Sequence, residues 1–202
     1  MLILIIYHTP LTSFSKLYSS FSSLISISDE EINAFSSVLK IRNYQKKEFL
    51  LDQGSVCKEI FFINSGMTRN IITNAKGKEI TTHFTLENKY TTEYASFLKQ
   101  KPASCSIQAL ETVEAVVITK EALQYGYEHI KEGNKLGRLI AEHYFMMITD
   151  KVEEIYADDT LDRLDKLNDT FPGIDQRVPQ HMIASFLGIT AVHLSRLRSS
   201  RV

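Results

Sequence analysis

Residues 180–197 read Gln180-His-Met-Ile-Ala-Ser-Phe-Leu-Gly-Ile-Thr-Ala-Val-His-Leu-Ser-Arg-Leu197, and this stretch decides how the end of the chain folds. Its apolar places have the spacing at which two steeply crossed helices share one core. These places are held by Ile183, Leu187, Ile189, Leu194 and Leu197. Ala184 is small where the second helix passes closely, Gly188 permits a sharp turn, and Thr190 suits an N-cap. The pattern predicts a helix-turn-helix.

The end of the chain is also positively charged. Residues 179–202 contain three Arg, two His and no Asp or Glu, whereas the whole chain has a formal net charge of -1. A positive charge on a helix-turn-helix favours DNA as its ligand. An ordinary helical hairpin that ends in a solvated basic tail is the alternative.

The second helix of such a unit, here residues 190–200, enters the major groove of DNA. We expect Arg196 to contact a guanine edge in bidentate fashion, and Ala191 and Val192 to contact a thymine methyl group. Ser195 and Ser199 are further candidates for contact with base edges, whereas Thr190, Arg198 and Arg201 are expected to contact phosphates and so position the helix. The predicted DNA-binding residues are Thr190, Ala191, Val192, Ser195, Arg196, Arg198, Ser199 and Arg201.

The region from residue 47 to residue 119 has a β pattern. Short apolar or β-branched runs are broken by the turn sequences Asp52-Gln-Gly54, Asn64-Ser-Gly66 and Asn74-Ala-Lys-Gly77. Such closely spaced turns predict an antiparallel roll or sandwich. Residues 11–40 have helical spacing, with a capping box at Ser28 and Glu31. The apolar run Met1 to Tyr7 is too short for a membrane span, which needs about 20 residues, so we expect it to pack; a mis-assigned start is the alternative.

A long amphipathic helix is predicted from Lys135 to Tyr156. We interpret its apolar stripe as the interface of a homodimer, because a helix this long overhangs a small roll; packing on the roll of its own chain is the alternative. The stripe consists of Leu136, Ile140, Tyr144, Met147, Ile148, Val152 and Ile155. An acidic connector follows. The predicted domains are a helical segment with a β-roll sensor (1–134), the dimerisation helix (135–157) and the helix-turn-helix domain (158–202).

The composition excludes several classes of protein. With 202 residues, 44% of them hydrophobic and 23% charged, the chain is globular rather than disordered. The two cysteines are too few for a four-thiolate iron–sulfur cluster or a zinc ribbon, so we expect a reduced, cytoplasmic location and no metal. We predict no enzyme, because the sequence has no catalytic triad, phosphate loop or metal-spaced cluster.

The order of parts resembles the Crp/Fnr superfamily of bacterial transcription regulators, and its short, Bacteroidetes-type members in particular. The local sequences that carry the resemblance are Phe49-Leu-Leu-Asp-Gln-Gly54, Ile60-Phe-Phe-Ile-Asn-Ser-Gly66, Ser106-Ile-Gln-Ala-Leu-Glu111 and Gln176-Arg-Val-Pro-Gln180. The resemblance implies an α+β fold with a cyclic-nucleotide-binding-like antiparallel β-roll, flanking helices, a long dimerisation helix and a terminal helix-turn-helix. It also implies a homodimer on a palindromic operator, RNA polymerase as a further partner, and no membrane association.

The effector pocket that the resemblance implies is degenerate. Family members that bind cyclic AMP usually have a Phe-Gly-Glu loop followed by Arg-Ser or Arg-Thr, where the Glu holds the ribose and the Arg neutralises the phosphate. Here the corresponding pocket residues are Thr92, Glu93, Ser104 and Cys105. The Glu is retained but the Arg is missing, and burying an unpaired phosphate is costly. We therefore predict that cyclic AMP is not the effector and that no cofactor is required.

Three further interpretations stay open. A haem would need an axial ligand such as His83 or Cys57, although lone residues of this kind are more often packing residues. Redox sensing by Cys57 or Cys105 requires an exposed thiol with a lowered pKa. Finally, with only three Arg at its end, the chain is alternatively a ligand-binding or protein-interaction module that has lost productive DNA binding.

Overall fold

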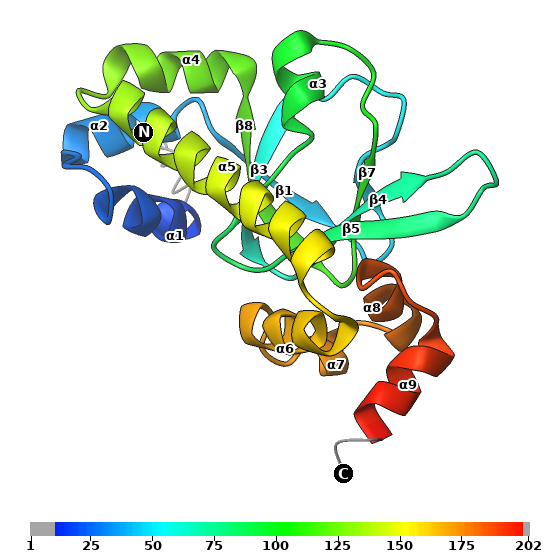
Figure 1. Cartoon of the computed structure of the whole chain (residues 1–202). Coiled ribbons are helices and arrows are strands. Elements are labelled where there is room, and N and C mark those ends of the chain that lie inside the picture. Colours follow the sequence, from blue (N-terminus) through cyan, green and yellow to red (C-terminus); the bar gives the residue numbers. More distant parts are fainter. Residues whose placement is uncertain (1–10, 200–202) are drawn as a thin grey trace, which may run out of the picture.

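A computed structural model describes residues 11–199 of the chain (Figure 1). The predictions for Met1 to Tyr7 and for Arg201 lie outside the described residues. The helices are α1 (Leu11–Ser22), α2 (Asp29–Ser36), α3 (Tyr94–Lys99), α4 (Lys120–His129), α5 (Gly133–Ala157), α6 (Thr160–Thr170), α7 (Ile174–Arg177), α8 (Gln180–Phe186) and α9 (Ala191–Ser199). The strands are β1 (Lys40–Tyr44), β2 (Phe49–Leu51), β3 (Glu59–Ser65), β4 (Thr68–Thr73), β5 (Glu79–Thr85), β6 (Tyr90–Thr91), β7 (Ser106–Ala109) and β8 (Val113–Thr119).

The strands form two antiparallel sheets that face each other as a roll. One sheet has the order β1-β8-β3-β6 and the other the order β2-β7-β4-β5. Gly66, with φ 85°, makes the tight turn between β3 and β4, where an added Cβ would lie 2.3 Å from the carbonyl oxygen of Thr112. Only glycine fits that position without a backbone shift. The α+β fold predicted from the sequence is confirmed.

The sheet that contains β3 is covered on both faces, which explains the unbroken apolar run Ile60-Phe-Phe-Ile63. Phe61 and Ile63 point between the sheets, into the core that also holds Phe97, Ile107 and Val117. Phe62 points to the other face and packs against the helices at the start of the chain. A strand buried on both faces needs apolar side chains at every place rather than at alternate places.

The helices α1, α2 and α4 form a cap on that outer face together with the first turns of α5 (Figure 1). The predicted capping box of α2 is present: the N–H of Glu31 donates to Ser28 Oγ at 3.2 Å, and the N–H of Ser28 donates to Glu31 Oε2 at 2.8 Å. The aromatic rings of Phe21 and Phe35 meet in this cap. The cap therefore fixes the direction in which α5 leaves the roll.

From the cap, α5 crosses the molecule to the helix-turn-helix domain, which we define as residues 160–199 (Figure 1). This domain shares one hydrophobic core with the roll. Met67, Phe84 and Leu110 of the roll are buried against the helices of the domain. The rings of Phe84, Phe171 and Phe186 lie 5.3 to 6.1 Å apart, centroid to centroid. Separating the domain from the roll would expose these rings to water, at a cost in free energy.

Candidate nucleic-acid interface and effector region

The terminal helices α8 and α9 form the predicted helix-turn-helix. Ile183, Leu187 and Leu194 are buried between them, and Ile189 and Leu197 pack at the edge of the same core. The turn depends on Gly188, whose φ of 72° is in the left-handed region. Thr190 precedes α9 and accepts a hydrogen bond from the N–H of His193 at 3.2 Å, as an N-cap does.

The outer face of α9 does not pack against the hydrophobic core of the chain. Ala191, Val192, Ser195, Arg196 and Ser199 are exposed, and 63% of Val192 is accessible to solvent. Because the five residues follow the helical repeat, they form one continuous surface that ends at the N-terminus of α9. Among the described residues, Arg196 is the cation on this surface that no ion pair engages.

Arg198, predicted from the sequence to contact phosphate, is paired with a carboxylate of its own chain in this structure. The guanidinium of Arg198 forms an ion pair with Asp175 of α7, and its side chain is only 24% exposed. The pair links α9 to α7 within the helix-turn-helix domain. The carboxylate of Asp175 offsets the positive charge that Arg198 would bring to DNA.

Polar contacts that the sequence did not reveal fix the domain on the roll. Arg177 of α7 forms ion pairs with Glu87 and Glu111, which lie in two loops of the roll. The N–H of Thr81, in β5, donates to Ser185 Oγ of α8 at 3.0 Å. These partners are far apart in sequence, so neither periodicity nor motif spacing could have predicted them.

Lys151 joins the long helix to the same junction. Its Nζ lies 3.8 Å from the centroid of the Phe186 ring, a cation–π contact between α5 and α8. Burial and the nearby Lys151 lower the pKa of His83, in β5, to about 4. The ring of His83 packs edge-on against Phe171 at 6.2 Å. His83 is therefore a neutral packing residue at neutral pH, which agrees with the packing interpretation given above.

The predicted effector residues lie around the start of α3. Glu93 is the N-cap of α3, and its carboxylate accepts a hydrogen bond from the N–H of Ser96 at 2.6 Å. Thr92 Oγ1 donates to the carbonyl oxygen of Glu59 at 3.0 Å. Ser104 is exposed, whereas Cys105 is buried. Local hydrogen bonds thus already engage Glu93 and Thr92, and no cation stands at Ser104 or Cys105 to meet a phosphate.

The two cysteines do not meet the condition set for redox sensing. Both are buried, and burial raises the pKa of the Cys105 thiol to about 11, with Glu93 adding to the effect. Cys57 Sγ lies 3.3 Å from Thr92 Oγ1 and 3.3 Å from the carbonyl oxygen of Glu59. A protonated, buried thiol is a poor nucleophile.

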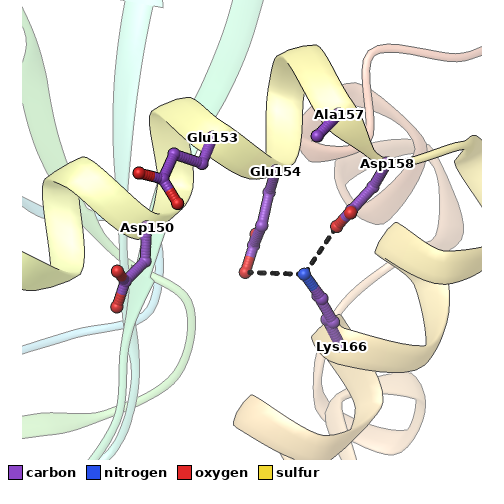
Figure 2. A pocket seen from close by; sticks show the side chains of 6 residues that line it. All are labelled: Asp150, Glu153, Glu154, Ala157, Asp158 and Lys166. Carbon is purple, nitrogen blue, oxygen red and sulfur yellow. Dashed lines mark ion pairs between the residues drawn. The ribbon is translucent and has the colours of Figure 1, made fainter.

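Two of the surface clefts formed by the described residues lie against the helix-turn-helix domain. Figure 2 shows the first, where Asp150, Glu153 and Glu154 of α5 lie near Asp158 and Lys166. Lys166 Nζ is 2.7 Å from Asp158 Oδ2 and 4.0 Å from Glu154 Oε1. The surplus of carboxylates makes this cleft unfavourable for DNA. Within residues 11–199, no group of three or more His, Cys, Asp or Glu side chains is arranged to hold a metal ion.

The second cleft lies between the β4–β5 hairpin and the helix-turn-helix. Arg69, Lys78 and Glu79 line it on the side of the roll. On the other side it is lined by residues of α8, of the turn before α9 and of the start of α9, including His181, Ser185, Thr190 and Ala191. It is therefore continuous with the N-terminal end of the exposed α9 surface.

The predicted dimer stripe on α5 is divided between two faces of the helix. Leu136 is buried in the core of the cap, Ile140 packs against that core, and the hydroxyl of Tyr144 is hydrogen-bonded to the backbone of Tyr90. These three residues contact their own chain, which corrects the predicted interface. Met147, also in the predicted stripe, is only partly exposed.

An adjacent face of α5 is apolar and exposed. It contains Ile148, Val152 and Ile155, which are part of the predicted stripe, and also Phe145, which is 69% exposed and is not part of that stripe. The gaps from Phe145 through Ile148 and Val152 to Ile155 are three, four and three residues. This repeat is visible in the sequence, but it merges there with the neighbouring apolar places Leu136, Ile140 and Tyr144. We call these four residues the outer seam.

None of the helices between residues 11 and 199 has the length and apolar character that crossing a membrane requires. Residues 41–128 match the family model of the cyclic nucleotide-binding domain. No curated protein sequence gives a significant match.

Several solved structures are similar to this chain. FixK2 from Bradyrhizobium japonicum superposes with a TM-score of 0.67 and 13% sequence identity, over 81% of this chain and 84% of that chain. The c-di-GMP responsive global regulator CLP of Xanthomonas campestris gives a TM-score of 0.65 with 15% identity, over 86% and 91% of the chains. A CooA mutant from Carboxydothermus hydrogenoformans gives 0.64 with 17% identity, over 88% and 86%. These likenesses confirm the predicted resemblance in fold.

Proposed function

We propose that this chain, which contains a cyclic nucleotide-binding domain and has the fold of the Crp/Fnr regulators, is a sequence-specific DNA-binding transcription regulator. The observation that carries the proposal is the outer face of α9. It is exposed, free of acidic side chains, and bears Arg196, which forms no ion pair with any of the residues that the structure describes. Arg196 would read a guanine, and Ala191 and Val192 would contact a thymine methyl group.

The regulator acts as a homodimer joined along the outer seam. The alternating gaps of three and four residues from Phe145 to Ile155 are those of a two-stranded coiled coil. A parallel pair of α5 helices brings both helix-turn-helix domains to the same end of the dimer. Two α9 helices can then enter successive major grooves about 34 Å apart, which is the spacing that a palindromic operator requires.

Cyclic AMP does not control this regulator. A cyclic nucleotide brings a phosphate that needs a cation, and neither Ser104 nor Cys105 supplies one. Glu93, the retained pocket residue, is engaged as the N-cap of α3.

The proposal is tested by selecting DNA from a random-sequence library with the purified chain and measuring affinity for the enriched site at several salt concentrations. We expect a palindromic site, and a logarithm of affinity that falls linearly with the logarithm of salt concentration. Arg196→Ala should weaken binding to the selected site by about 10-fold or more, since a good bidentate contact contributes about 1–3 kcal/mol of discrimination.

Lys120→Ala is the matched control, because Lys120 is exposed at the start of α4, far from α9 (Figure 1). It should bind the selected site like the wild type. Failure to enrich any sequence, or binding that is insensitive to salt, would refute the proposal and favour a module without productive DNA binding.

A further inference from the structure

The β4–β5 hairpin of the roll lies beside the helix-turn-helix (Figure 1). The hydrogen bond from the Thr81 N–H to Ser185 Oγ fixes β5 against α8 at 3.0 Å. The cleft between them runs from Lys78 on the hairpin to Thr190 and Ala191 at the start of α9. A ligand of α9 that extends past its N-terminal end therefore meets the hairpin.

The charges of this cleft leave a surplus of cations. Glu79 is the carboxylate among its lining residues, and its Oε2 lies 2.6 Å from Arg69 Nη2. The buried Arg69 also donates to Gln108 Oε1 at 2.8 Å. Because Arg69 and Glu79 neutralise each other, the charge that faces the solvent is that of Lys78.

A second lysine stands next to the first on the hairpin turn. The N–H groups of Lys76 and Lys78 both donate to Asn74 Oδ1, at 2.9 and 3.1 Å, which fixes the backbone of the turn. Both side chains are exposed, and within the described part of the chain neither forms an ion pair. The hairpin thus presents two free ammonium groups on a rigid turn.

The helix-turn-helix domain itself has few free cations. Arg177 is paired with Glu87 and Glu111, and Arg198 is paired with Asp175. The remaining arginine of the described helices α7 to α9 is Arg196, which forms no ion pair with the described residues. Phosphate neutralisation supplies a large share of DNA affinity. A duplex held by α9 would therefore gain much from cations outside the domain, and the lysines of the hairpin are at the edge of the same surface.

We propose that the β4–β5 hairpin is a second DNA contact, in which Lys76 and Lys78 bind backbone phosphates that flank the half-site read by α9. This inference rests on the proposed function and adds to it a contribution of the roll to DNA binding. The contact is with the backbone, so it raises affinity for all sequences equally and leaves base preference to α9.

The test compares the double variant Lys76→Ala/Lys78→Ala with the wild type on the selected DNA site. We expect the slope of log affinity against log salt to become shallower by about 2, and binding at about 0.1 M salt to weaken by about 10-fold or more, equally for the selected site and for unrelated DNA. The control Lys120→Ala/Lys131→Ala, which removes one exposed lysine at the start of α4 and one just after its end, should change neither quantity.

Two results would overturn the inference: an unchanged salt slope in the double variant, or tighter binding, which would mean that the hairpin obstructs DNA. If either occurs while Arg196→Ala still weakens binding, only the contact by the hairpin is refuted. If the wild type binds no DNA, the proposed function and this inference fail together.

Discussion

The guanidinium of Arg177 in α7 donates two hydrogen bonds to the carboxylate of Glu87 in the loop after β5, at 2.7 and 3.2 Å. The same guanidinium pairs with Glu111, in the loop between β7 and β8. One side chain of the helix-turn-helix domain thus holds two loops of the roll. Arg177 suits this position because its fork of donors can serve two carboxylates at once.

Arg177→Met should loosen the helix-turn-helix domain from the roll without unfolding either. The ion pairs are partly exposed, so we expect a loss of about 1 kcal/mol at the junction. Amide hydrogen exchange should become faster in α7 and α8. Arg42→Met is the matched control, because Arg42 makes an equivalent pair with Glu59 within one sheet, at 2.7 and 2.8 Å. Equal protection of α7 and α8 in both variants would contradict this role of Arg177.

Protonation of His83 should make the stability depend on pH. Burial and Lys151 lower its pKa to about 4 in the folded chain, whereas a histidine in an unfolded chain titrates near 6.5. Between these values the unfolded chain binds a proton that the folded chain does not. The free energy of unfolding should therefore fall as the pH decreases from 6.5 towards 4, by at most about 1.4 kcal/mol per pH unit.

Urea unfolding at pH 7, 6 and 5 measures this dependence. His83→Gln should flatten it over that range, since glutamine does not titrate. His143→Gln, at an exposed position of α5, is the control and should keep the slope of the wild type. Parallel stability curves for His83→Gln and the wild type would show that another group is responsible.

The long helix α5 shows which features the sequence predicts and which it does not. Its apolar spacing predicts a helix, because side chains three and four places apart share a face. Spacing does not say which neighbour each face meets. Here one face, with Leu136 and Tyr144, packs on the cap and roll, and a second face, with Phe145 and Ile148, is exposed. Two adjacent apolar faces merge into one broad stripe in the sequence, and only the tertiary structure separates them.

The outer seam predicts where a charge should disrupt the proposed homodimer. Ile148→Asp should produce monomers in sedimentation equilibrium, because it would bury a carboxylate between two apolar helices. The monomer should stay folded, since Ile148 is 59% exposed in the isolated chain. Met146→Asp is the control: Met146 is also exposed but points away from the seam, so this variant should remain a dimer. A dimeric Ile148→Asp would mean that another surface joins the subunits.

The candidate site was only partly predictable. The helix-turn-helix depends on local spacing, so residues 183–197 could be assigned from the sequence alone. The partners of Arg198 and Glu93 could not, for different reasons. Arg198 meets Asp175 through the fold of the domain. Glu93 matches a family motif, yet its carboxylate caps α3, and a motif letter does not distinguish a ligand contact from a helix cap.

Glu93→Ala should change stability rather than ligand binding. Loss of the cap on α3 is expected to cost about 1 kcal/mol in the free energy of unfolding, as measured by urea titration. Calorimetry should detect no cyclic AMP binding to the wild type or to the variant. The opposite result, micromolar binding in the wild type that Glu93→Ala abolishes, would restore the nucleotide-binding role that the family motif implies.

Asp175→Asn should tighten DNA binding. Asp175 offsets the charge of Arg198, so its replacement by a neutral side chain of the same shape releases one cation on α9 for phosphate contact. We expect the slope of log affinity against log salt to steepen by about 1, with the preferred sequence unchanged, because phosphate contacts carry no base information. Asp169→Asn, which neutralises an exposed carboxylate on α6, is the control and should leave the slope within error. If both variants steepen the slope equally, DNA responds to the total charge of the domain and not to Arg198. If neither does, Arg198 faces away from the bound duplex, and its contribution is to hold α9 on α7.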